Sequence, residues 1–66
     1  MQVLRKEMKL KGLTIQDLSN RLGVSAGSVS GWIHGNNSPT SKFVKALKDM
    51  GFSDMACLDP SRDVEV

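Results

Sequence analysis

Apolar residues recur at intervals of three or four along two adjacent stretches of the chain, 14–22 and 25–34. This spacing is typical of amphipathic helices, so we expect a helix in each stretch. The two apolar stripes must face each other to be buried. They consist of Leu18, Leu22, Val24, Val29, Trp32 and Ile33.

Local signals mark where these two helices begin and where the chain turns between them. Thr14 followed by Asp17 has the spacing of a capping box, and Ser25 is placed to cap the second helix in the same way. Gly23 lies at the turn, where a positive φ costs glycine nothing. Ser19 has a small side chain at the point where the helix at 14–22 approaches the helix at 25–34. The sequence therefore predicts two steeply crossed helices joined by a tight turn.

Further helices are predicted on both sides of this pair. Residues 2–11 form the first helix, and Ser38 followed by Pro39 predicts the cap and first position of a fourth helix that runs to about Met50. Residues 53–58 add one short helical turn. The fold class expected is all-α, a compact domain of four to five helices.

The length of 66 residues allows one small domain with a modest core. A large catalytic cleft does not fit a chain of this size. Cys57, the single cysteine, cannot form an internal disulfide, and we expect a buried, unreactive thiol in a reducing compartment. The expected core comprises Leu4, Met8, Leu13, Leu18, Leu22, Val24, Val29, Trp32, Phe43, Leu47, Met50, Phe52 and Leu58.

Charge is distributed unevenly, although the net charge is only +2. Residues 1–48 hold eight lysines and arginines against two acids, whereas residues 49–66 hold one arginine against five acids. The first part can therefore concentrate around a polyanion. We place the domain at 1–58 and interpret 59–66 as an acidic, flexible tail. Alternatively, Val64 and Val66 could add an edge strand to a partner.

The segment with these turn and capping signals resembles the helix-turn-helix of the lambda-repressor and Cro-like (XRE) family. The resemblance extends over about residues 1–58 and implies a five-helix domain whose third helix enters the major groove. It implies a DNA-binding regulator, of a kind commonly encoded by phages or prophages. The residues that carry it are Leu13, Thr14, Leu18, Ser19, Leu22, Gly23, Val24, Ser25, Val29, Ser30, Gly35 and Pro39.

The resemblance also implies which residues contact double-stranded DNA. Those at base-reading positions of the third helix are Ser25, Ala26, Gly27, Ser28, Ser30, Gly31 and His34. Polar groups near helix starts and in the following loop are candidates for phosphate contacts. They are Thr14, Gln16, Arg21, Asn36, Asn37 and Lys42. The family usually has glutamine where this chain has Ile15, which leaves one phosphate contact in doubt.

The side chains at the reading positions are small, so we expect weak direct readout of bases, without bidentate contacts. Gly27 and Gly31 each cost about 1 kcal/mol of helix stability relative to alanine. Two effects could offset that cost: close approach to DNA, or tight packing of this helix against another. Otherwise the helix is poorly formed in the free protein. His34 ends the helix, where it either contacts phosphate or interacts with the helix dipole.

These patterns favour a small cytoplasmic regulator that binds an operator, with a homodimer left open. One alternative is an accessory factor that organises DNA in phage transposition or excision. A second is an antitoxin-like module that binds a protein partner. We expect no enzyme, cofactor, metal or small-molecule ligand, because His34 and Cys57 are the only residues of their types. No apolar run is long enough for a membrane span or a signal peptide.

Overall fold

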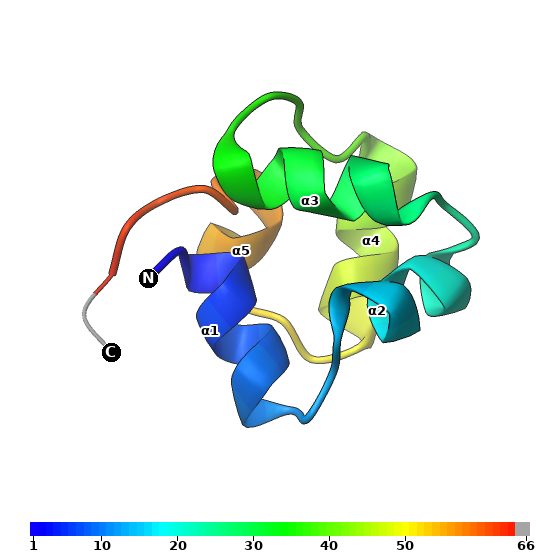
Figure 1. The fold of residues 1–66 in the computed structure, drawn as a ribbon, viewed down its shortest axis with the longest axis horizontal. Helices are drawn as coiled ribbons and strands as arrows, with labels where there is room; N and C mark the ends of the chain where they lie inside the picture. The colour runs from blue at the N-terminus through cyan, green and yellow to red at the C-terminus, as the bar shows by residue number, and fades with distance from the viewer. Residues whose placement is uncertain (65–66) are drawn as a thin grey trace.

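The computed structural model describes residues 1–64 and contains five α-helices within that range. Figure 1 shows α3 lying across the domain above α1 and α2, with α5 beside α1. The predicted all-α fold is therefore confirmed. The helices are α1 (Val3–Leu10), α2 (Ile15–Leu22), α3 (Ala26–His34), α4 (Ser41–Asp49) and α5 (Asp54–Leu58). None of the helices in residues 1–64 combines the length and apolarity that a membrane crossing requires.

The fourth helix begins later than the sequence predicted. Thr40 has the extended backbone of a cap residue, and its carbonyl accepts the first helical hydrogen bond from the N–H of Val44 at 2.8 Å. The predicted start at Ser38 and Pro39 is wrong by two residues. Pro39 is half-buried and lines a groove together with Val44, so it packs in the loop instead of opening the helix.

One buried cluster lies between the helices. Fully or almost fully buried side chains come from all five helices and from Phe52. Most predicted core residues are buried or pack against this cluster, but Leu58 is 67% exposed and its prediction was wrong. Ala56 and Cys57 fill the core at α5 instead, and burial raises the pKa of the Cys57 thiol. The expectation of a buried cysteine is confirmed.

Residues 60–64, predicted to be part of a flexible tail, lie against the start of the chain. The N–H of Val3 donates to the carbonyl of Arg62 at 2.8 Å, and the N–H of Val64 donates to that of Met1 at 2.8 Å. Pro60 is buried and Val64 packs against the core. The prediction of an edge strand for a partner also involved Val66, which lies outside the described residues.

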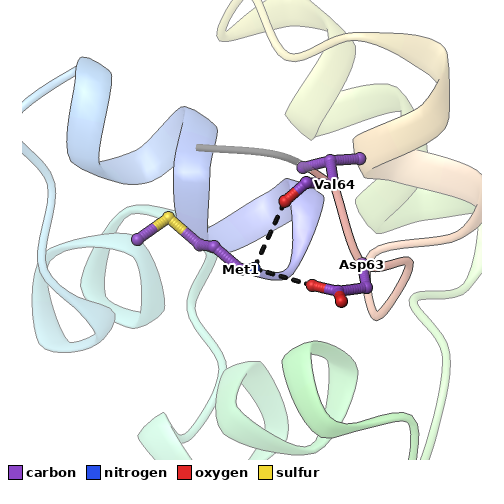
Figure 2. A network of polar contacts seen from close by, with 3 residues as sticks. All are labelled: Met1, Asp63 and Val64. Carbon is purple, nitrogen blue, oxygen red and sulfur yellow. Dashed lines mark hydrogen bonds and ion pairs between the residues drawn. The ribbon is translucent and has the colours of Figure 1, made fainter.

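A polar network completes the contact between the two ends. Figure 2 shows the α-amino group of Met1 donating to Asp63 Oδ1 at 2.6 Å and to the carbonyl of Val64 at 3.3 Å. The hydrogen bond and the positive charge of this amino group lower the pKa of Asp63. The ionised carboxylate therefore stabilises the folded state.

Replacing Asp63 by asparagine should lower the melting temperature at pH 7. Because the folded-state pKa of Asp63 is below its ordinary value of 3.8, its contribution is present above that value and is lost as the pH falls through the folded-state pKa. Thermal melts from pH 7 to pH 2 should show the two proteins converging at low pH. Asp49→Asn is the control, since Asp49 ends α4 and removing its charge there should not destabilise the helix. Equal melting temperatures of wild type and Asp63→Asn at pH 7 would contradict the assignment.

Candidate nucleic-acid interface

The start of α2 is fixed by the capping box that the sequence predicted. The hydroxyl of Thr14 accepts from the N–H of Asp17 at 3.1 Å, and the carboxylate of Asp17 accepts from the N–H of Thr14 at 3.1 Å. The hydrogen bond from the N–H of Thr14 to this carboxylate, and then the side chain of Thr14, lower the pKa of Asp17. Thr14 is thereby fixed at the start of α2, and the nearby Gln16 donates from Nε2 to Asn20 Oδ1 at 3.0 Å. Both Thr14 and Gln16 are exposed.

The turn between α2 and α3 also follows the local signals in the sequence. Gly23 has φ of 72°, in the left-handed region that favours glycine, and its N–H donates to the carbonyl of Ser19 at 2.9 Å. Ser19 is buried where α2 packs against α3. Ser25 caps α3 by accepting from the N–H of Ser28 at 3.2 Å. The angle between the two helices is thus set by the turn and by packing.

The face of α3 opposite the core presents small side chains and one imidazole. Val29, Trp32 and Ile33 anchor the inner face in the core. Gly27 and His34 are exposed and lie two turns apart on the outer face. Between them lies half-buried Ser30, which contacts His34: its Oγ is 3.3 Å and its carbonyl oxygen 2.9 Å from the Nδ1 atom. Ala26 and Ser28 are half-buried near the helix start.

The glycines of α3 have different surroundings. A Cβ atom on Gly27 would meet nothing closer than the Oγ of Ser25 at 3.8 Å. A Cβ atom on Gly31 would lie 2.0 Å from Oδ1 of Asn37, and Gly31 is buried. The structure thus places Gly31 under the side chain of a loop residue, whereas the packing alternative in the sequence analysis involved another helix.

The loop after α3 is attached to that helix through the same glycine. The backbone N–H groups of Asn36 and Asn37 both point to the carbonyl of Gly31, at 2.9 and 3.5 Å. Gly35 ends the helix with φ of 82°, which reverses the chain toward this carbonyl. Asn36 and Asn37 are exposed, so they are held beside α3 while their amide groups remain accessible.

The remaining predicted contacts lie in two places. Lys42, in the first turn of α4, is exposed with its ammonium group 5.7 Å from the ring centroid of Phe43. Arg21 is exposed on α2 but lines a hollow with Lys11, Leu13 and Met50, none of which belongs to α3 or the loop after it. The structure therefore groups the α3 residues with Asn36 and Asn37, and places Arg21 apart from them.

The charge of this surface suits a polyanion. Residues 25–42 contain no aspartate or glutamate, and they contain His34 and Lys42. Serine hydroxyls can donate or accept one hydrogen bond to a base edge or a phosphate. Arg5 and Lys9 on α1 also lie near Thr14 and Gln16, where both pairs line one groove. No role was predicted for Arg5 and Lys9 from the sequence, although their spacing of four residues places them on one face of a helix.

The fold and this surface together define a helix-turn-helix domain. A family model described as helix-turn-helix matches residues 4–48. No curated protein and no solved structure matched the chain in the other two comparisons. Because the match spans more than half of the chain, the protein belongs to this family of XRE and lambda-repressor-like DNA-binding domains, which is not enzymatic.

Combining Gly31→Ala with Asn37→Ala should reveal the contact between these residues. Alanine in place of glycine inside a helix adds about 1 kcal/mol of stability. In the wild-type background part of this gain is offset because the new methyl group displaces Asn37, whereas in the Asn37→Ala background the full gain should appear. We expect a coupling energy of at least about 0.5 kcal/mol in a double-mutant cycle measured by urea unfolding. Equal gains in both backgrounds would show that Asn37 does not lie over Gly31.

Proposed function

We propose that the protein is a small transcriptional regulator of the phage repressor or Cro type, which occupies an operator with α3 in the major groove. One observation carries this proposal: the outer face of α3 has no acidic side chain and, apart from the imidazole at its end, only small ones, while Val29, Trp32 and Ile33 fix its inner face in the core. A rigid helix with a smooth face can approach base edges closely.

The proposed readout combines weak base contacts with the shape of the DNA. Ser28 and Ser30 each offer single hydrogen bonds, and Ala26 offers a methyl group for a thymine methyl. None of the side chains on this face forms the bidentate contact that discriminates strongly between bases. We therefore infer that DNA deformability contributes much of the specificity. Phosphate contacts add affinity and fix the position of the domain, and the residues proposed for them are Thr14, Gln16, Asn36, Asn37 and Lys42.

Two copies on adjacent half-sites would multiply these weak contacts. Met55 and Leu58 are exposed on α5, and Leu58 borders a groove of about 390 Å³ with Pro39 and Val44. Lys45 and Lys48 line the same groove, and Lys48 pairs with Asp54 of its own chain, with Nζ 3.4 Å from Oδ1. We propose this surface for a homodimer on DNA, acting in the cytoplasm of a bacterial host.

Hydroxyl-radical footprinting tests the proposal on a DNA duplex that the protein has selected from a random pool. A regulator should protect two short backbone segments about one helical turn apart, with a stoichiometry of two chains per site. Extended protection with bending of the DNA would instead support an accessory factor in transposition or excision. Absence of protection, together with a protein partner at fixed stoichiometry, would support the antitoxin-like alternative.

A further inference from the structure

A groove of about 560 Å³ runs between α1 and the start of α2. Its floor is apolar: Met8 is buried, and Leu13 and Ile15 are half-buried. Exposed polar and charged side chains form its sides. The lining residues are Met1, Arg5, Met8, Lys9, Leu13, Thr14, Ile15 and Gln16.

Both charged side chains in this lining are cations. Arg5 and Lys9 are exposed and lie one helical turn apart on α1. Within residues 1–64 neither of them forms an ion pair. Their positive charge is therefore available to a ligand.

The acidic side chains nearest the groove are hydrogen-bonded to other groups of the protein. The carboxylate of Glu7 accepts hydrogen bonds from the N–H and the hydroxyl of Ser53, on the side of α1 that faces α5. Asp17 accepts from the backbone of Thr14, and Asp63 from the amino group of Met1. No carboxylate lines the groove, so it is complementary to an anion.

The groove is continuous with the interface proposed above. Thr14 and Gln16, two of the proposed phosphate contacts, form one side of it, and Arg5 and Lys9 belong to α1 on the other. A DNA strand that passes the start of α2 would bring its next phosphates to Arg5 and Lys9. The alternating apolar sugars and anionic phosphates of that strand match an apolar floor with cationic sides.

We propose that Arg5 and Lys9 bind backbone phosphates of the DNA on which α3 is docked, extending the interface from α2 onto α1. This inference rests on the proposed function. Contacts of this kind position the protein and add affinity without adding base specificity. Their signature is therefore in the salt dependence of binding.

The test compares Arg5→Ala/Lys9→Ala with Lys11→Ala/Arg62→Ala, which removes the same charge from exposed residues outside this groove and outside the proposed dimer surface. Affinity is measured by fluorescence anisotropy over a series of salt concentrations, with one duplex that the wild-type protein selects from a random pool. Each lost phosphate contact reduces the slope of log affinity against log salt by about 0.9, so we expect a reduction of about 1.8 for the groove variant and less than about 0.5 for the control. The conservative variant Arg5→Lys/Lys9→Arg should retain the wild-type slope.

An unchanged slope for the groove variant, or equal reductions in both variants, would overturn the inference. Thermal melts verify that each variant is folded, which we expect because all four side chains are exposed. Wild-type protein that retains no duplex would refute the proposed function itself. Wild-type binding with an unaffected groove variant would refute only the role of Arg5 and Lys9.

Discussion

Replacing Trp32 by alanine should leave the domain largely unfolded at 25 °C. Trp32 is 3% exposed, lies on the inner face of α3, and has its ring centroid 5.8 Å from that of Phe43. Truncating a buried tryptophan costs about 3–5 kcal/mol. A single core in a domain of this size supplies about the same total stability. Far-UV circular dichroism should therefore show loss of most helical signal.

Two controls separate this effect from a general sensitivity to mutation. Trp32→Phe keeps an aromatic ring in the core and should remain folded with a lower melting temperature. Met55→Ala removes a large side chain that is exposed on α5, and it should change stability little. A cooperative thermal transition for Trp32→Ala near that of the wild type would contradict the role of Trp32 as the anchor of α3.

Replacing Gly27 by glutamate should abolish specific DNA binding without unfolding the protein. A Cβ atom at Gly27 points into open space, and the position lies in the first turn of α3, where an acidic side chain is favourable. In the proposed complex the new carboxylate would face the DNA, and juxtaposed like charges cost several kcal/mol. We expect affinity to fall at least about 100-fold, which corresponds to about 2.7 kcal/mol, in anisotropy titrations.

Matched variants distinguish charge, size and location. Gly27→Gln has nearly the same shape as the glutamate variant without the charge, and it should lose less affinity. Arg62→Gln changes the net charge by the same amount at an exposed residue outside α3 and should weaken binding only slightly. Wild-type affinity in Gly27→Glu would show that this face of α3 does not meet DNA.

The start of α2 and the turn before α3 were predictable because their determinants are local. A hydroxyl and a carboxylate three residues apart in Thr14 and Asp17 specify a capping box, and Gly23 supplies the positive φ of the turn. The periodic apolar residues of α2 and α3 then determine which faces pack together. These features depend on neighbours within about one or two helical turns.

Features that depend on distant contacts were missed. Pro39 has the sequence signature of a helix start, but it lies in the loop, half-buried beside a groove, and α4 begins after the cap residue Thr40. The helical turn at 54–58 is too short for a periodic pattern to distinguish Leu58 from Cys57. The pairing of residues 60–64 with the N-terminus joins segments about sixty residues apart, which no local signal encodes.

In the candidate interface, too, some features follow from local sequence and others depend on distant contacts. The capped start of α3 could be expected from local spacing, whereas its base-reading residues were implied by the resemblance to the helix-turn-helix family. The contact of Gly31 with Asn37 could not, since it depends on how the chain folds back after Gly35. Likewise, the spacing of Arg5 and Lys9 places them on one face of a helix, but their position beside Thr14 depends on how α1 lies against the start of α2.

Selection from a randomised duplex pool at physiological salt tests the central claim most directly. The retained DNA would be sequenced after several rounds with the wild-type protein, with Gly27→Glu as the negative control. The account predicts enrichment of a palindrome whose half-sites lie about one helical turn apart, lost in the variant. Failure of the wild-type protein to retain any duplex would contradict the claim that α3 reads DNA.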